Sequence, residues 1–97
     1  MFARVLECQA KDGRGVQISV KVTNDVLPVL QVLPGFVAFF AVSDKTNAEK
    51  LMCISFWTLG NAEEFHQEYY ETVTDMLEAV LECPPTLKTF TTEELYD

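Results

Sequence analysis

Ninety-seven residues provide enough chain for one hydrophobic core and too little for two, so the sequence predicts a single domain over residues 1–97. Hydrophobic residues make up 48% of the chain and aromatic residues 11%, which excludes the composition of a disordered protein. Fifteen acidic residues outnumber seven basic ones, and the net charge of -8 has the wrong sign for binding nucleic acid or an anionic membrane.

The cysteines and the apolar runs predict a cytoplasmic protein without a membrane segment. Cys8, Cys53 and Cys83 are odd in number and widely spaced, which fits neither a disulfide framework nor the paired spacing of zinc and redox sites. No segment has the pattern of a signal peptide. The longest apolar run covers residues 36–42, whereas a membrane-spanning helix needs about twenty residues.

The first half of the chain predicts a strand, a helix and a second strand. Residues 2–10 are a short run of apolar and polar residues that ends at a glycine-rich turn, which predicts a first strand. Residues 16–33 place their branched apolar side chains on one helical arc and their polar side chains opposite, so we expect a helix with a kink at Pro28. Pro34 and Gly35 end that helix, and residues 36–43 follow as an aromatic strand.

The second half predicts a strand, a long helix and a last strand. Residues 44–50 are a polar hairpin connection, and residues 51–57 alternate between two apolar faces as a third strand. Residues 61–82 have the clearest helical pattern, and Pro84-Pro85 is its expected stop. The acidic side chains of this helix fall on one arc, which we interpret as a solvated face and not as a cation site. Residues 86–92 predict the fourth strand.

The order β-α-β-β-α-β predicts an α+β, ferredoxin-like fold, in which a four-stranded antiparallel sheet carries both helices on one face. The second and third strands are nevertheless apolar on both sides. A monomer would therefore expose a large apolar patch. We expect the protein to form a homodimer through its sheet faces.

Several segments resemble the antibiotic biosynthesis monooxygenase-like family of the dimeric α+β barrel superfamily. They are the Leu27-Pro28 pair, the Leu33-Pro34-Gly35-Phe36 turn, the third strand that ends in Trp57, and the acidic helix that begins at Asn61-Ala62-Glu63. The resemblance implies a dimer whose sheets pair face to face, with a small-molecule pocket between the helices and the sheet of each subunit. Activities in that superfamily include cofactor-independent oxidation of quinol-like aromatics and haem degradation.

His66 and Trp57 are the candidate catalytic residues. His66 is the only histidine, and its helical angle places it inside the apolar arc, where an imidazole can act as a general base or bind a metal. The alternative is a histidine at the edge of the core that is hydrogen-bonded to its surroundings. Trp57 ends the third strand nine residues earlier and could reach the same pocket, or could be an ordinary core aromatic.

The resemblance also implies substrate-binding residues. The quinol-oxidising branch uses a cavity lined by Trp, Tyr and Asn, and this chain offers Trp57 but no Asn in the third strand. Either Arg4 or a tyrosine hydroxyl could stabilise a phenolate. The expected substrate-binding side chains are Arg4, Phe65, Tyr69 and Tyr70. The haem-degrading branch adds an Asn on the first strand, which residues 2–10 lack, so haem degradation is the least favoured activity.

The sequence therefore predicts a homodimer that binds an apolar or aromatic small molecule. Its enzymatic form is a monooxygenase of quinol-like substrates that uses neither a metal nor another cofactor. The alternative is a non-catalytic dimer that binds a ligand or has a structural role. Cys8 and Cys53 lie in strands predicted to be neighbours, and we interpret them as buried structural thiols.

Overall fold

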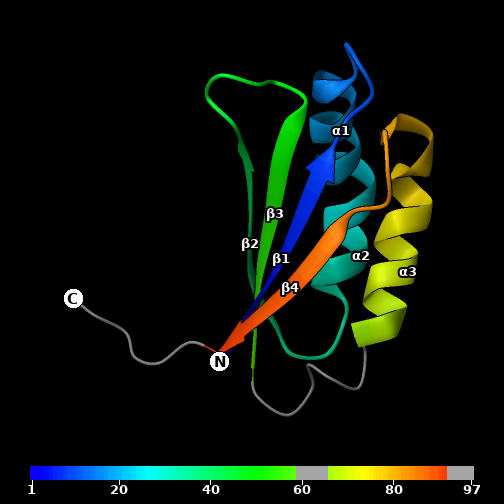
Figure 1. Ribbon diagram of the computed structural model, residues 1–97. Helices are drawn as coiled ribbons and strands as arrows, with labels where there is room; N and C mark the ends of the chain where they lie inside the picture. Colours follow the sequence, from blue (N-terminus) through cyan, green and yellow to red (C-terminus); the bar gives the residue numbers. More distant parts are fainter. Residues whose placement is uncertain (59–65, 92–97) are drawn as a thin grey trace.

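Four strands form one antiparallel sheet in the computed structural model, which describes residues 1–58 and 66–91 (Figure 1). The strands are β1 (Phe2–Gln9), β2 (Phe36–Ser43), β3 (Lys50–Trp57) and β4 (Thr86–Thr91), in the spatial order β2-β3-β1-β4. Each neighbouring pair is antiparallel. The predicted α+β, ferredoxin-like architecture is confirmed.

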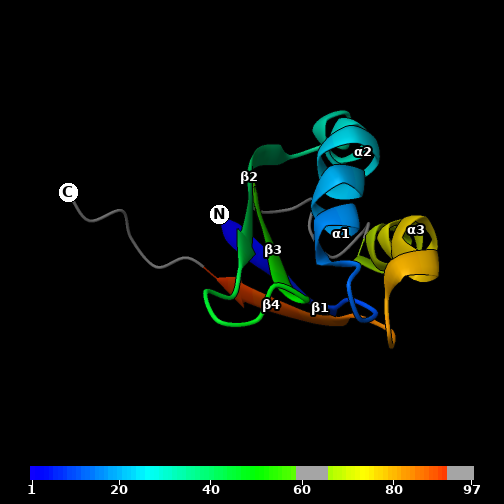
Figure 2. The same ribbon diagram turned by 90° about the horizontal axis from the view of Figure 1, so that it is seen from above.

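All the helices cover the same face of the sheet (Figure 2). The first helical stretch consists of α1 (Gly15–Lys21), a π-helical turn (Val22–Val26) and α2 (Leu27–Gln31). Pro28 is the second residue of α2, which continues directly from the π-helical turn, so its missing N–H falls inside the helical stretch. The irregularity expected at Pro28 is the π-helical turn just before it. No helix in the described residues is long and apolar enough to span a membrane.

The second helix is shorter than the sequence predicts. Helix α3 runs over His66–Leu77 and ends in a 3-10 turn, Glu78–Val80, so the predicted end at residue 82 is wrong. The cause is tertiary pairing. Leu81 forms a β-bridge with Ala10 just beyond β1, and the backbone N–H of Glu82 donates to the carbonyl of Gln9. The predicted start at residues 61–65 lies outside the described residues.

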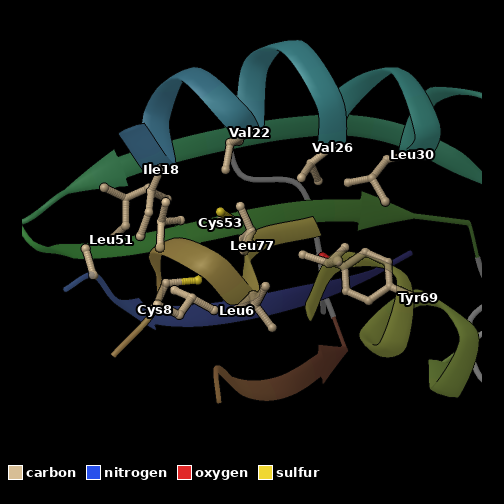
Figure 3. Close-up of a cluster of buried hydrophobic side chains, with 14 of the residues drawn as sticks. Leu6, Cys8, Ile18, Val22, Val26, Leu30, Leu51, Cys53, Tyr69 and Leu77 are labelled. Carbon is tan, nitrogen blue, oxygen red and sulfur yellow. The ribbon is translucent and has the colours of Figure 1, made fainter. Parts of the chain in front are cut away.

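The hydrophobic core fills the space between the sheet and the helices (Figure 3). Its helical side is Ile18, Val22, Val26 and Leu30 from the first stretch and Tyr69, Val73 and Leu77 from α3, all buried. Its sheet side comes from alternate residues of the two central strands, namely Phe2, Leu6, Cys8, Leu51, Cys53 and Trp57. The apolar arc predicted for the first helix therefore faces the sheet, and so does the side of α3 opposite its acidic arc.

A β-bulge corrects the predicted faces of β2. Phe36 pairs with Trp57, and Ala38 pairs with the next residue of β3, Phe56, so Val37 is the extra residue in the ladder. The sequence alternation placed Phe36 on the same face as Ala38. The extra residue instead lets Phe36 pack edge-on against Trp57 on the helix side, with the ring centres 5.6 Å apart.

The sheet surface that faces away from the helices is mostly apolar, and we call it the open face. Phe40 on β2 and Phe90 on β4 are more than half exposed, at 56% and 51%. The Phe40 and Phe56 rings meet edge to face at 6.1 Å. The remaining apolar members of the open face, taken from the strand register, are Ala3, Val5, Ala38, Val42, Met52 and Ile54.

Candidate functional site

The antiparallel register of β1 and β3 brings a polar group of residues into the covered face. Phe2 pairs with Trp57, and Arg4 pairs with Ser55. Because side chains alternate along a strand, all four of these side chains point toward the helices. Tyr69 reaches the same place from α3, one turn after the helix begins. We call Phe2, Arg4, Ser55, Trp57 and Tyr69 the arginine cluster.

The guanidinium of Arg4 is surrounded by aromatic rings. Its central carbon lies 4.8 Å from the ring centre of Tyr69, 5.2 Å from that of Trp57 and 5.5 Å from that of Phe2. Arg4 is only 1% exposed. Ring faces carry negative partial charge, so these contacts stabilise a cation that burial has removed from water. The aromatic cage therefore holds a fixed positive charge inside the core.

Hydrogen bonds orient Trp57 through Ser55. The indole Nε1–H donates to Ser55 Oγ at 2.8 Å, and Ser55 Oγ lies 3.5 Å from the hydroxyl of Tyr69. Because an indole can only donate, Ser55 accepts from it and has its own proton left for the Tyr69 oxygen. The Trp57 and Tyr69 rings also meet at 90°, with centres 5.9 Å apart. Ser55 thus contacts the polar groups of both Trp57 and Tyr69 and helps to orient the two side chains.

Burial sets the protonation states of the cluster. Burial lowers the pKa of Arg4, and the neighbouring Tyr69 hydroxyl raises it in turn. The group remains a cation near neutral pH, because a guanidinium starts from a very high pKa. Burial raises the pKa of Tyr69 to about 12, against smaller opposing effects of Ser55 and Arg4. At neutral pH the cluster therefore presents a permanent cation beside a neutral phenol, which can donate a hydrogen bond.

A cavity of about 60 Å³ adjoins the cluster between α2 and α3. Tyr69 belongs to both the cavity wall and the cluster. The other lining residues are Val29, Leu30, Leu33, Glu68 and Thr72. Ligand pockets for drug-sized molecules usually measure about 300–1,000 Å³. An aromatic ligand therefore requires α2 and α3 to separate, or the cluster to rearrange.

The structure brings three of the predicted site residues together and separates one from them. Arg4, Trp57 and Tyr69 are all in the cluster. Tyr70, the next residue along α3, turns away, and its hydroxyl donates to the carbonyl of Pro85 at 2.9 Å. The backbone of His66 begins α3, but its side chain lies outside the described residues, as does all of Phe65.

Sequence reasoning missed Ser55 and Phe2 as members of the site. A serine between Cys53 and Trp57 is the only non-apolar residue on the helix side of β3, and it is 0% exposed. A hydroxyl at a position whose neighbours are buried must find a hydrogen-bond partner. The place of Ser55 among the buried, helix-facing residues of β3 was the signal that could have identified it as a site residue.

A second pair of polar groups lies deeper in the same face. Cys8 and Cys53 come from adjacent strands, both are buried, and their thiols are close enough to affect each other's pKa. That contact and the burial raise the pKa of Cys53, so the thiol stays protonated and unreactive. Within residues 1–58 and 66–91 no three histidine, cysteine or acidic side chains are grouped as a metal site requires.

Comparisons with solved structures find the same fold in several bacterial proteins. A Bordetella bronchiseptica protein provisionally named an antibiotic biosynthesis monooxygenase has a TM-score of 0.76 at 9% identity, over 96% of this chain and 97% of that one. A protein of the same provisional name from Deinococcus radiodurans has a TM-score of 0.76 at 11% identity, over 100% and 97%. A third, from Nitrosomonas europaea, has a TM-score of 0.75 at 12% identity, over 95% and 98%.

The structural similarity to these proteins confirms the fold that the sequence resemblance implies. The sequence itself matches no family model and no curated relative. The chain has the fold of the solved antibiotic biosynthesis monooxygenase structures, with nearly complete coverage on both sides.

Proposed function

We propose that this protein is a homodimeric, cofactor-independent monooxygenase of quinol-like aromatic substrates, which react at the arginine cluster. The observation that carries the proposal is the buried group of Arg4, Trp57 and Tyr69 between sheet and helices. A core built only for stability has little use for a buried guanidinium, because removing that charge from water is costly. The fold shared with provisionally named monooxygenases adds support.

The chemistry needs a base and a group that stabilises negative charge. A base removes the phenolic proton of the substrate, and the phenolate passes one electron to dioxygen. The resulting radical pair joins through a new C–O bond at the ring carbon next to the one that carries the phenolic oxygen, a position where the quinol still has a hydrogen. Loss of the proton on that carbon and cleavage of the O–O bond give a quinone and water. The substrate supplies all the electrons, and the two released protons end in the water.

The cluster matches the second requirement. The Arg4 cation lies over the ring of Tyr69, whose hydroxyl is neutral, and fixed positive charges and donors stabilise a phenolate best where water is excluded. His66 is the proposed base, because it is the only histidine of the chain and begins the helix that carries Tyr69. Trp57 forms one wall against which an aromatic ring can stack.

The test is dioxygen consumption with a panel of quinols, in the wild type and in His66→Ala. The variant should lose about tenfold or more of the rate, because general-base catalysis contributes on the order of a hundredfold. Val16→Ala is the control, since Val16 is 75% exposed on α1 and far from the cluster in the fold. Equal rates in wild type and His66→Ala would remove His66 from the mechanism. No consumption with any quinol would refute the oxygenase.

The open face supports the dimer part of the proposal. Stable interfaces bury about 800 Å² from each partner and have an apolar centre. The open face offers Phe40, Phe56 and Phe90 on three different strands, and two of these rings are more than half exposed. Sedimentation at micromolar concentration should give twice the 11.0 kDa chain mass. A species at the chain mass would refute the dimer.

A non-catalytic dimer is the second candidate, and the small cavity favours it. The approximately 60 Å³ beside Tyr69 cannot hold a quinol without movement, and the aromatic rings of the cluster pack against one another. In a non-catalytic dimer the cluster is part of the hydrophobic core, and the faces of its aromatic rings stabilise the Arg4 cation. The quinol panel separates the two functions, because the non-catalytic dimer consumes no dioxygen.

A further inference from the structure

The cavity between α2 and α3 has room for a molecule much smaller than a quinol. Its volume is about 60 Å³. A site for one water molecule needs only about 10–15 Å³. The cavity therefore suits a molecule of very few atoms, such as a few waters or a diatomic gas, although it is too small for an aromatic ring.

The wall that α2 contributes to the cavity is entirely apolar. It consists of Leu30, which is buried, and of Val29 and Leu33, which are partly buried. These aliphatic side chains offer no hydrogen bond to a molecule inside. Apolar cavities of this kind stay dry and take up apolar molecules, because transfer of such molecules out of water is favourable.

The wall that α3 contributes adds few polar partners. Tyr69 directs its hydroxyl to Ser55, at 3.5 Å, so it is committed to the other side of the helix layer. Glu68 is exposed to solvent, and Thr72 is partly buried. An ordered buried water makes about three hydrogen bonds. The lining therefore favours a small neutral apolar molecule over ordered water.

The cavity lies next to the arginine cluster and has a way in from solvent. Tyr69 lines the cavity, and its ring centre is 5.9 Å from that of Trp57 in the cluster. The residue before it, Glu68, lines the same cavity and is exposed, so the cavity is reached from that side. A small molecule that enters there is separated from the cluster by one tyrosine side chain.

We infer that the cavity between α2 and α3 is a binding site for dioxygen, held beside the arginine cluster. The inference rests on the proposed function, because dioxygen is the second substrate of that reaction. Dioxygen is diatomic, uncharged and apolar, so it matches both the volume and the lining of the cavity. Holding it close to the substrate replaces a chance encounter with a local one, which favours the electron transfer from the phenolate.

The first measurement uses xenon and then dioxygen itself on the full chain. Xenon binds in apolar cavities, and its pressure is raised while the methyl NMR resonances of Val29, Leu30 and Leu33 are followed. These resonances should shift along a saturating curve, whereas those of Val16, which is 75% exposed on α1, should not. Dioxygen is paramagnetic and should broaden the three cavity residues more than Val16. Helium at the same pressure controls for pressure alone.

Two valines of the same helical segment provide a variant and its matched control. Val29→Phe fills the cavity and should abolish the saturating xenon shifts of Leu30 and Leu33. It should also raise the KM for dioxygen about threefold or more in quinol oxidation and leave the KM for the quinol unchanged. Val32→Phe makes the same change at an 80% exposed position just after α2, and it should behave as the wild type. The wild-type xenon titration tests the site even where Val29→Phe does not fold.

The outcomes separate this inference from the proposed function. If xenon gives no saturating shift in the wild type, or dioxygen broadens the cavity residues no more than Val16, the dioxygen site is refuted, and the quinol panel still decides the monooxygenase. Saturating shifts of Leu30 and Leu33 that survive in folded Val29→Phe also overturn the site. Binding of dioxygen by a protein that oxidises no quinol supports the site and refutes the monooxygenase.

Discussion

The two faces of the sheet reverse the usual distribution of polar and apolar residues. The covered face buries a guanidinium, a serine hydroxyl and a tyrosine hydroxyl, whereas the open face exposes phenylalanines to solvent. Both faces arise from the same strands, because alternate residues of β1 and β3 point to opposite sides. This reversal is the reason for proposing a functional site on the covered face and a partner on the open face.

The covered face mixes two parts with different roles. Toward the start of β1 lies the arginine cluster, where each polar group has a ring or a hydroxyl as neighbour. Toward the end of β1 the packing is aliphatic, with Leu6, Ile18 and Leu77 fully buried. Mutations in the second part should change stability, and mutations in the first should change binding. The following predictions test this division and the contrast with the open face.

The largest expected effect is on the aliphatic part of the covered face. Leu6 is 0% exposed, and Leu6→Ala should lower the free energy of unfolding by about 2–5 kcal/mol, through lost burial and a new cavity. Urea denaturation at a fixed protein concentration measures the change. Val16→Ala, at a 75% exposed position, is the control and should change it by less than about 1 kcal/mol. A loss of similar size in both variants contradicts the position of the core.

The next effect concerns the open face. Phe40→Glu places a charge at one of the most exposed phenylalanines of the open face and should weaken dimerisation by about 2 kcal/mol or more, or roughly thirtyfold in the dissociation constant. Sedimentation over a concentration series measures the shift.

Val16→Glu makes the same chemical change at an exposed valine of α1, outside the open face, and serves as the control. Its dissociation constant should equal that of the wild type. If Phe40→Glu dimerises as well as this control, the open face is not the interface.

The smallest effect is a pH dependence from Tyr69. Its pKa is raised to about 12 from an ordinary value near 10, so between these values the unfolded chain releases a proton that the folded chain keeps. The free energy of unfolding should therefore be unaffected by Tyr69 below pH 10 and fall as the pH rises toward 12, by up to about 2–3 kcal/mol.

Tyr69→Phe isolates this contribution, because the lysines titrate in the same range in both proteins. The difference between wild type and variant should shrink as the pH rises from 9 to 12. A difference that stays constant shows that Tyr69 ionises as easily in the folded protein as in the unfolded one.

The strands and their faces could be predicted because alternation is a local property of the sequence. Met52, Ile54 and Phe56 were assigned to one side of β3, and the structure has them there. The bulge at Val37 could not be predicted, since residues 36–42 are apolar at every position and a slip of one residue changes nothing in the pattern. The end of α3 was wrong because Leu81 pairs with Ala10, a contact between distant parts of the chain.

The site was predicted in its aromatic residues and only partly in its polar ones. Trp57 and Tyr69 were recognised from the resemblance, and Arg4 was named as a group that could stabilise charge. The burial of Arg4 follows from its alternation with Phe2 and Leu6, but a charged residue is usually assigned to the surface. The separation of Tyr70 required the structure, because adjacent helical residues differ in direction by about a quarter turn.

The two outer strands of the sheet have a consequence for how far assembly can proceed. β2 and β4 are the edges, and unpaired strand edges tend to recruit further chains into fibres. The bulge at Val37 interrupts the ladder of β2, and β4 carries a lysine, Lys88, near its middle. Both features discourage edge-to-edge growth. The proposed association through the open face would use the same surface on both copies, so it would close at two copies and not continue into a polymer.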